Sequence, residues 1–382
     1  MNSSRNLGDV FSDHGYSSHL AVIDFLHDGS PRETTYNQLT EGSNAVARGL
    51  RKAGLKKGTR IGILALNRLE YLEVLFGSMR AGCIPVMLNA KLPAHQIQYI
   101  ISDANTQLVF GDEDLRELCS SETRYISFDN DNYLKFKDHG PFKSFQPGPD
   151  DVAEQPYTSG STGYPKGVLL HHFGQCWMID RLVESRSLVP EDCGMISAPL
   201  YHKNALLAVK SALQAAGKIV LLPKFNVEQY IKSIEKYEIT MLTGVPTMYA
   251  LMLQQEKILS MTKINSVRSI SMGSAPASEA LLDQLQNRFP NARINLNYGI
   301  TEGGPILFSW KHPDGLERPR TTVGFPINGV EIALEDGPNE NQGTLKVRSP
   351  GVMLGYHNLP DATKRDLKDG WLNTGDILKR DE

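Results

Sequence analysis

The residues best suited to chemistry lie together in residues 157–168. Positions 158–163 hold four serine or threonine hydroxyls and two glycines, and Lys166 follows three residues later. Hydroxyls and backbone N–H groups are the donors that wrap a polyphosphate, while glycine lets the backbone approach closely and lysine adds a point charge. We therefore predict that this stretch binds the phosphates of a nucleotide.

The spacing differs from that of a Walker A loop. That loop needs glycine, four residues, and then glycine, lysine and serine or threonine. Here Pro165 precedes Lys166 and Gly167 follows it. A serine- and glycine-rich surface turn is the plainer interpretation of such a run. The length and order of Thr-Ser-Gly-Ser-Thr-Gly-x-Pro-Lys-Gly favour a binding loop instead.

This run resembles the phosphate-loop signature of the adenylate-forming superfamily, which contains acyl-CoA synthetases, adenylation domains of peptide synthetases and luciferases. Three further segments resemble family motifs in the family's order: residues 297–302 (Asn-Tyr-Gly-Ile-Thr-Glu), 347–356, and 370–376 (Gly-Trp-Leu-Asn-Thr-Gly-Asp). The resemblance covers essentially the whole chain from residue 35 onward. It is strongest to an acyl-CoA synthetase, that is, a carboxylate–CoA ligase.

The resemblance implies a two-step reaction. A fatty or aryl acid is activated by ATP to an acyl-adenylate with release of pyrophosphate, and CoA then forms the thioester; Mg²⁺ accompanies ATP or AMP. Two alternatives stay open. One is an adenylation domain that loads a carrier-protein thiol, and the other is a non-catalytic nucleotide-binding module.

The same resemblance implies which residues hold the phosphates and the metal. Glu302 would ligate Mg²⁺, and Thr301 would donate its hydroxyl to the α-phosphate. With Lys166 and His202 these two residues are the expected catalytic set. The residues expected to hold the β- and γ-phosphates are Thr158, Ser159, Gly160, Ser161, Thr162, Gly163 and Lys166.

Adenosine needs a flat apolar slot with a few polar groups at its edge. Tyr298 resembles the family's stacking aromatic, and Asp376 would accept hydrogen bonds from both ribose hydroxyls. The small-residue wall opposite Tyr298, together with the rest of its motif, would comprise Gly273, Ser274, Ala275, Pro276, Asn297, Gly299 and Ile300.

His202 resembles the family residue that flanks the acid or the path of the thiol. The residues expected to line the acid pocket with it are Thr243, Met248, Gly303, Gly304, Pro305 and Ile306. Lys203 and Asn204 stand where the family often has small or apolar residues. We expect Lys203 to face solvent; the alternative is that it pairs with a second anionic group of the substrate.

The elements that must position these residues alternate between strand and helix. Buried strands are predicted at residues 60–66, 84–88, 107–110, 219–222, 240–243 and 269–272, with amphipathic helices at residues 39–50, 69–79, 227–234, 246 onward and 281–289. Such alternation implies parallel sheets covered by helices. Residues 330–334 and 344–347 alternate in polarity, which suggests antiparallel strands. Residues 112–150 are polar, and we expect loops there.

We therefore expect an α/β fold like the large N-terminal domain of acetyl-CoA synthetase. It would contain two helix-covered, mostly parallel sheets and a smaller distorted antiparallel β-barrel. Approximate subdomains would be 1–170, 171–320 and 321–382. The family's C-terminal lid domain, with its lysine, is not found in the sequence, so a weakly active fragment is expected.

Composition agrees with a cytoplasmic enzyme. The chain has 382 residues, 40% of them hydrophobic and 22% charged, with a net charge of −3. That balance gives no sign of a nucleic-acid partner or a basic membrane patch. The four cysteines lack CxxC spacing, so reduced, mostly buried thiols are expected. The amino terminus resembles no secretory signal, and no apolar run approaches the length of a membrane span.

Overall fold

The computed structural model describes residues 5–12, 15–158, 163–304, 306–309, 315–316 and 318–381. Its largest sheet has the strand order β14-β13-β12-β10-β11-β1-β2. Every neighbouring pair in it is parallel except β1 and β2. The bounds of its strands are β1 (Leu20–Phe25), β2 (Pro31–Thr35), β10 (Cys193–Ile196), β11 (Lys218–Leu221), β12 (Met241–Gly244), β13 (Ser269–Met272) and β14 (Arg293–Leu296).

A second parallel sheet has the order β4-β3-β5-β6. Its strands are β3 (Arg60–Leu64), β4 (Ile84–Met87), β5 (Leu108–Gly111) and β6 (Tyr125–Ser127). The helices that belong to this part of the chain are α1 (Tyr36–Lys52), α2 (Leu69–Arg80), α3 (Ala94–Asp103) and α4 (Asp131–Phe136). Thr35 begins α1 with a capping box, and Gly54 follows the helix with φ +77.

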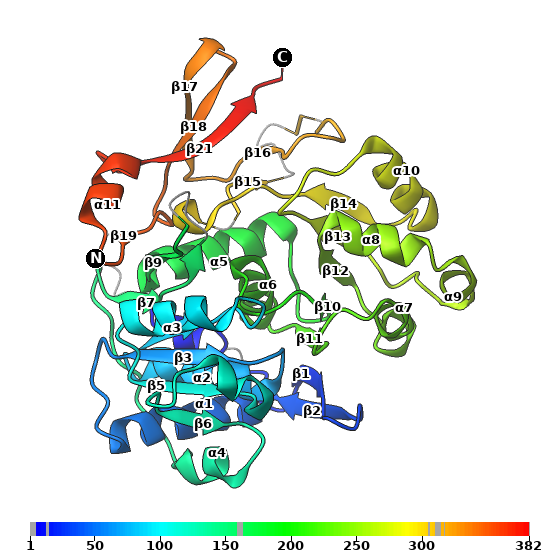
Figure 1. Ribbon diagram of the computed structural model, residues 1–382. Coiled ribbons are helices and arrows are strands. Elements are labelled where there is room, and N and C mark those ends of the chain that lie inside the picture. Colours follow the sequence, from blue (N-terminus) through cyan, green and yellow to red (C-terminus); the bar gives the residue numbers. More distant parts are fainter. Residues whose placement is uncertain are drawn as a thin grey trace.

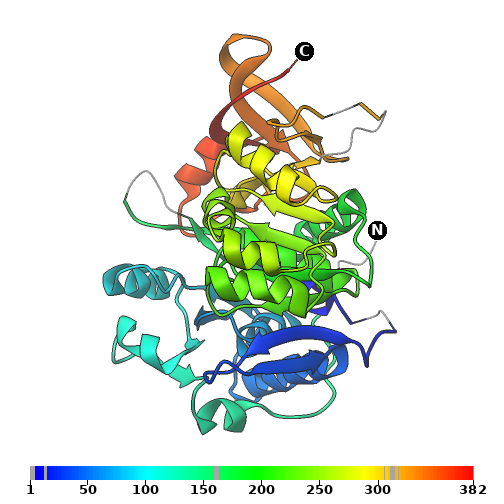
Figure 2. The ribbon, with the colours of Figure 1, turned by 90° about the vertical axis from the view of Figure 1, so that its right-hand side faces the viewer.

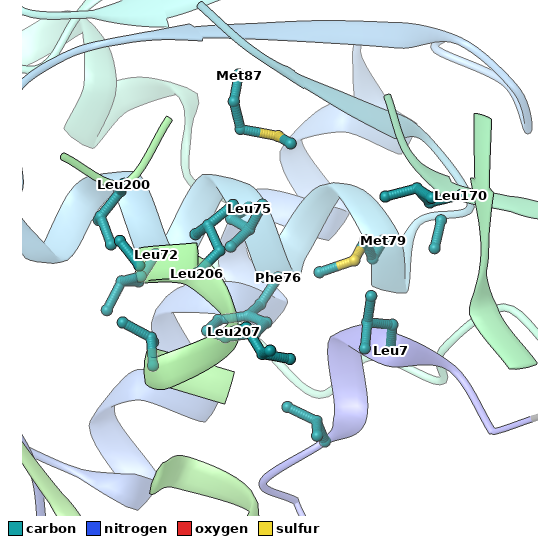
Figure 3. Packing of buried hydrophobic residues seen from close by; sticks show 14 of the residues in the cluster. Leu7, Leu72, Leu75, Phe76, Met79, Met87, Leu170, Leu200, Leu206 and Leu207 are labelled. Carbon is teal, nitrogen blue, oxygen red and sulfur yellow. The ribbon is translucent and has the colours of Figure 1, made fainter. Parts of the chain in front are cut away.

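Helices α5 (His172–Arg186) and α6 (Lys203–Gln214) cross the middle of the molecule between the two sheets (Figure 1). Leu72 and Phe76 of α2 and Leu206 and Leu207 of α6 belong to one buried cluster, which joins the two parts of the chain (Figure 3). The remaining helices of the large sheet are α7 (Val227–Lys236), α8 (Pro246–Leu253), α9 (Glu256–Met261) and α10 (Glu279–Arg288).

Apart from the β1–β2 pair, the antiparallel strands of the described residues form three small sheets. One contains β7 (Val152–Glu154), β8 (Tyr157–Thr158), β9 (Lys166–His171) and β19 (Gly355–Tyr356), and another pairs β15 (Phe308–Ser309) with β16 (Phe325–Pro326). The third has the order β17 (Glu331–Asn339), β18 (Gln342–Arg348), β21 (Trp371–Lys379), β20 (Leu367–Lys368), beside α11 (Pro360–Asp366). Figure 2 shows this third sheet at the end of the molecule opposite the blue amino-terminal elements.

The structure confirms the predicted α/β class with helix-covered parallel sheets. Hydrogen bonds between the described residues leave the antiparallel strands as separate sheets and close no barrel. The proposed division at residues 170 and 320 stays a prediction. All four cysteines are free and buried, as expected. In the part of the chain that the structure describes, no helix is both long and apolar enough to cross a bilayer.

The expectation of loops throughout residues 112–150 is wrong. This segment contains a 3₁₀ helix, Glu113–Leu118, as well as strand β6 and helix α4. Tyr133 of α4 and Phe128 bury their rings against each other at 5.0 Å between centroids, and both approach Phe110 of β5. The two aromatic residues supply the apolar contacts that order an otherwise polar segment.

Candidate functional site

The candidate phosphate loop joins two antiparallel strands. Thr158 at the end of β8 and Lys166 at the start of β9 are register partners, so the strands fix both ends of the loop. Gly163 has φ +89, a conformation that glycine adopts without strain. Ser159, Gly160, Ser161 and Thr162 lie outside the described residues.

Glu302 lies where three segments meet. It belongs to the 3₁₀ helix Thr301–Gly303, and its Oε1 accepts hydrogen bonds from Thr158 Oγ1 at 3.0 Å and from the Tyr356 hydroxyl at 3.2 Å. Burial, with the negative charges of Glu302 and Asp366, raises the pKa of Tyr356, so its phenol stays a donor. The carboxylate is therefore held against the end of the phosphate loop.

Lys166 is held by the carboxylate of Asp366 and the ring of Tyr356. Its Nζ lies 3.7 Å from Asp366 Oδ2 and 3.9 Å from the centre of the Tyr356 ring. The hydrogen bond from Arg365, helped by the charges of Arg365 and Lys166, lowers the pKa of Asp366 and keeps it ionised. The lysine thus sits at the edge of the site, with its charge partly balanced by a carboxylate that sequence reasoning did not single out.

Tyr298 and Asp376 also come together. The Tyr298 hydroxyl donates to Asp376 Oδ2 at 2.7 Å, which joins the segment after β14 to strand β21. Burial and this hydrogen bond raise the pKa of Tyr298. The Tyr298 ring packs edge to face on Phe308 at 5.8 Å, which fixes the plane of the aromatic side chain.

The predicted small-residue wall follows β13. A Cβ at Gly273 would lie 3.2 Å from the backbone oxygen of Asn297, so a larger residue would crowd the neighbouring segment. Ser274 has φ +65, and Ser274, Ala275 and Pro276 are all exposed. Asn297 donates to Ser271 Oγ at 2.7 Å, which ties the segments after β13 and β14 together.

Two cavities adjoin these residues, of about 390 Å³ and about 300 Å³. Both are lined by His202, Lys203 and Thr301, which therefore form the wall between them. The larger cavity also contacts Thr158 and Gly163 of the phosphate loop. The smaller is lined by residues that follow the carboxyl ends of parallel strands, where ligands of open α/β sheets bind: Ala198, Gly244, Val245, Gly273, Ser274, Asn297, Gly299 and Ile300.

His202 precedes α6, and its ring lies 4.7 Å from that of Tyr201. Partial burial and the nearby charge of Lys91 lower its pKa, so the imidazole is neutral at physiological pH. Thr243 also lines the smaller cavity, although its hydroxyl donates to the Met195 carbonyl at 2.8 Å.

Four other residues expected in the acid pocket lie in packed surroundings. Met248 is buried in the core of the large sheet, and Ile306 in the central core. Gly303 is surrounded by Leu372, Val347 and Ile300, and Gly304 (φ +99) faces Met178. Their contribution to acid binding stays a prediction, and Pro305 lies outside the described residues.

The expectation that Lys203 faces solvent is wrong. Its side chain is 4% exposed and forms an ion pair with Glu154 of β7, which also binds Lys210 at 2.6 Å. Sequence reasoning missed Glu154 and Lys210. One signal was available, because two lysines seven residues apart lie on the same face of a largely apolar helix.

Comparisons with known proteins find similarity over most of the chain. A family model described as "AMP-binding enzyme" matches residues 12–357. A 4-coumarate–CoA ligase of Petroselinum crispum is 30% identical over 385 residues, covering 92% of this chain and 70% of that protein. Feruloyl-CoA synthase of Amycolatopsis sp is 28% identical over 355 residues, covering 91% and 71%. Apo MatB from Rhodopseudomonas palustris has a similar structure, with TM-score 0.86 and 27% identity over 99% of this chain and 76% of that chain.

Proposed function

Because this chain belongs to the AMP-binding enzyme family, we propose that it is an AMP-forming carboxylate–CoA ligase. It activates a carboxylic acid with ATP to an acyl-adenylate and transfers the acyl group to the thiol of CoA. Relatives named as CoA ligases support this acceptor. The observation that carries the proposal is that Thr158 and Thr301 line two adjoining cavities, while Glu302 accepts a hydrogen bond from Thr158 and Asp376 accepts one from Tyr298.

The first step brings two anions together, because the carboxylate of the acid attacks the α-phosphate of ATP. The site must neutralise charge and hold the reactants in line. Lys166 and the donors of the loop at 158–163 bind the β- and γ-phosphates and the departing pyrophosphate. Thr301, in the wall between the cavities, donates to the α-phosphate.

The adenosine part is held by groups from the ends of two different sheets. Tyr298 stacks on the adenine, and Gly273 with Ser274 forms the opposite wall. Asp376 is exposed, and its Oδ2 already accepts from Tyr298 at 2.7 Å. The carboxylate is therefore oriented to accept the ribose hydroxyls in charge-assisted hydrogen bonds.

Mg²⁺ fits this site as a companion of the phosphates. In the described part of the chain no three acidic, histidine or cysteine side chains form a metal site by themselves. One carboxylate with two hydroxyls beside it is nonetheless sufficient, because Mg²⁺ takes its other ligands from phosphates and water. Glu302 would hold the ion, which supplies positive charge to the phosphate oxygens.

The acid binds in the smaller cavity beside His202 and Thr243, and the adenine lies next to it, beyond Gly273 and Ser274 of the same lining. About 300 Å³ lies at the low end of the range for small-molecule sites, and this favours a compact acid over a long acyl chain. An aryl acid of hydroxycinnamate size suits such a space. The names of the two relatives support this choice of class.

The test is the rate of pyrophosphate release with ATP and a panel of acids: 4-coumarate, ferulate, benzoate, malonate, octanoate and palmitate. We expect the aryl acids to be turned over best, with formation of the CoA thioester detected by chromatography. Pyrophosphate release with none of these acids would overturn the proposed activity. A carrier-protein thiol serves as the competing acceptor, and preference for it over CoA would favour an adenylation domain.

A further inference from the structure

A fully buried charge cluster lies behind the wall that the two cavities share. Glu154 of β7 binds two lysines of α6, with Oε1 accepting from Lys203 and Oε2 from Lys210 at 2.6 Å. The exposed fractions of the three side chains are 0%, 4% and 1%. The mechanism above assigns none of these residues a role.

The cluster contains two potential cations and one carboxylate. A buried charge without a counter-charge is costly, and the usual response is a change of protonation. Burial lowers the pKa of Lys203 well below its ordinary value, with a further contribution from Lys210, and burial lowers the pKa of Lys210 to about 7. At pH 8 the ligand-free cluster therefore holds at least one proton fewer than its two lysines could carry.

The titratable neighbours do not supply the missing negative charge. Cys176 and His172 of α5 lie close enough to Lys210 for its charge to affect their pKa values. Burial raises the pKa of Cys176, which stays a thiol, and lowers the pKa of His172 to about 4, so its imidazole is neutral. A second ammonium in the cluster needs an anion from elsewhere.

We place that anion at the junction of the two cavities, which is the wall that both of them share. Lys203 lines both of them, together with Thr301 and His202. In the proposed reaction this wall is where the acid carboxylate meets the α-phosphate of ATP. An anion held there lies beside the one member of the cluster that borders both cavities.

We propose that the Glu154–Lys203–Lys210 cluster couples anion binding at this junction to uptake of a proton. When a phosphoryl or carboxylate group occupies the junction, a proton from solvent adds to the neutral lysine amine, and both lysines become cationic. No bond of the ligand is made or broken in this step. The inference rests on the proposed function for the identity of the anion. It adds a contact between that anion and the ammonium group of Lys203.

The experiment is titration calorimetry of AMP binding at pH 8, where the phosphate is a dianion. Repeating the titration in two buffers with different ionisation enthalpies gives the number of protons taken up. We expect the wild-type chain to take up a large fraction of one proton with AMP. Adenosine, which has no phosphate, is expected to take up almost none.

Lys203→Met and Lys210→Met each leave one lysine and one carboxylate, a balanced pair that keeps the cluster packed. We expect both variants to bind AMP without proton uptake. Lys203→Met should also weaken AMP binding about tenfold, as for loss of a charge-assisted contact, and should leave adenosine unchanged. Lys91→Met removes an exposed lysine near His202 and is expected to keep the wild-type proton uptake.

Equal proton uptake in wild type and in both lysine variants would overturn the inference and leave the proposed function standing. Uptake that is as large with adenosine as with AMP would also overturn it, because the proton would then not follow the anion. A wild-type chain that binds neither AMP nor ATP would overturn both proposals.

Discussion

At the scale of single residues, Glu302 shows how much of the site depends on contacts between distant segments. Its Oε1 accepts from Thr158, 144 positions earlier in the chain, and from Tyr356, 54 positions later. These two bonds orient the carboxylate before it meets a ligand. A preoriented acceptor of this kind suits a metal that shares its shell with phosphates.

Glu302→Gln keeps the shape of the side chain and an oxygen for both hydroxyls, but removes the charge. We expect the Mg²⁺ concentration for half-maximal pyrophosphate release to rise by about tenfold or more, since a charge-assisted contact is lost. Tyr356→Phe is the matched control, because it removes one hydrogen bond and leaves the carboxylate. An unchanged Mg²⁺ requirement in Glu302→Gln would remove the residue from the metal site.

Asp376→Asn tests the ribose contact. The amide can still accept from Tyr298, whose hydroxyl donates to Asp376 at 2.7 Å in the wild type. We expect ATP and AMP affinities to fall by the same factor, about ten- to hundredfold, because both ligands carry the same ribose. Calorimetry measures both. Tyr298→Phe should weaken binding less, and an AMP affinity unaffected by Asp376→Asn would contradict the assignment.

At the scale of elements, the sequence predicted what periodicity and order can reveal. The helix at α1 and the strands at β3 and β13 follow from apolar spacing. The segment at 112–150 was misjudged, because its order depends on Phe128 and Tyr133 packing against a distant strand. Local polarity does not report such a contact.

Prediction of the site had the same limit. The motif residues Thr158, Tyr298, Glu302 and Asp376 are recognisable in order, and the structure joins them in two pairs, Thr158 with Glu302 and Tyr298 with Asp376. Partners outside the motifs were not recognisable. Asp366 beside Lys166 and Glu154 between two lysines owe their positions to chain segments that meet only in the folded molecule.

The pairing of β7 with α6 has a consequence for the pH dependence of stability. The pKa of Lys210 is about 7 in the folded chain and 10.5 for an ordinary lysine, so between these values the unfolded chain binds more protons. The free energy of unfolding therefore rises with pH across this window, and the contribution is lost as pH falls towards 7. One full proton corresponds to about 1.4 kcal/mol per pH unit.

We expect urea unfolding to show a wild-type free energy that rises from pH 7 to pH 8.5 more steeply than that of Lys210→Met. The buried cysteines titrate above this range and are common to both proteins, so they cancel in the difference. Parallel pH profiles for wild type and Lys210→Met would mean that this lysine keeps an ordinary pKa in the folded state.

At the scale of the whole molecule, the proposed nucleotide site draws on the large parallel sheet and on the antiparallel strands. Thr158 lies on β8, Tyr298 follows β14, and Asp376 lies on β21. Helices α2 and α6 join the two parallel sheets through one buried cluster. A ligand that contacts all of these parts at once stabilises their arrangement, because it binds only the folded state.

The last prediction follows from that assembly. We expect AMP at about one hundred times its dissociation constant to add about 2.7 kcal/mol to the free energy of unfolding and to raise the melting temperature by several degrees. Differential scanning calorimetry of the 382-residue chain measures this shift, with GMP as the control nucleotide. Asp376→Asn should reduce the AMP shift at the same ligand concentration, since less of the site is filled. A shift of equal size with GMP would mean that the phosphate and ribose contacts are sufficient to stabilise the chain and that the slot beside Tyr298 does not distinguish adenine from guanine. A transition that broadens or splits with AMP, rather than moving as a whole, would show that the sheets unfold independently, and the joint core of α2 and α6 would then not transmit the binding energy between them.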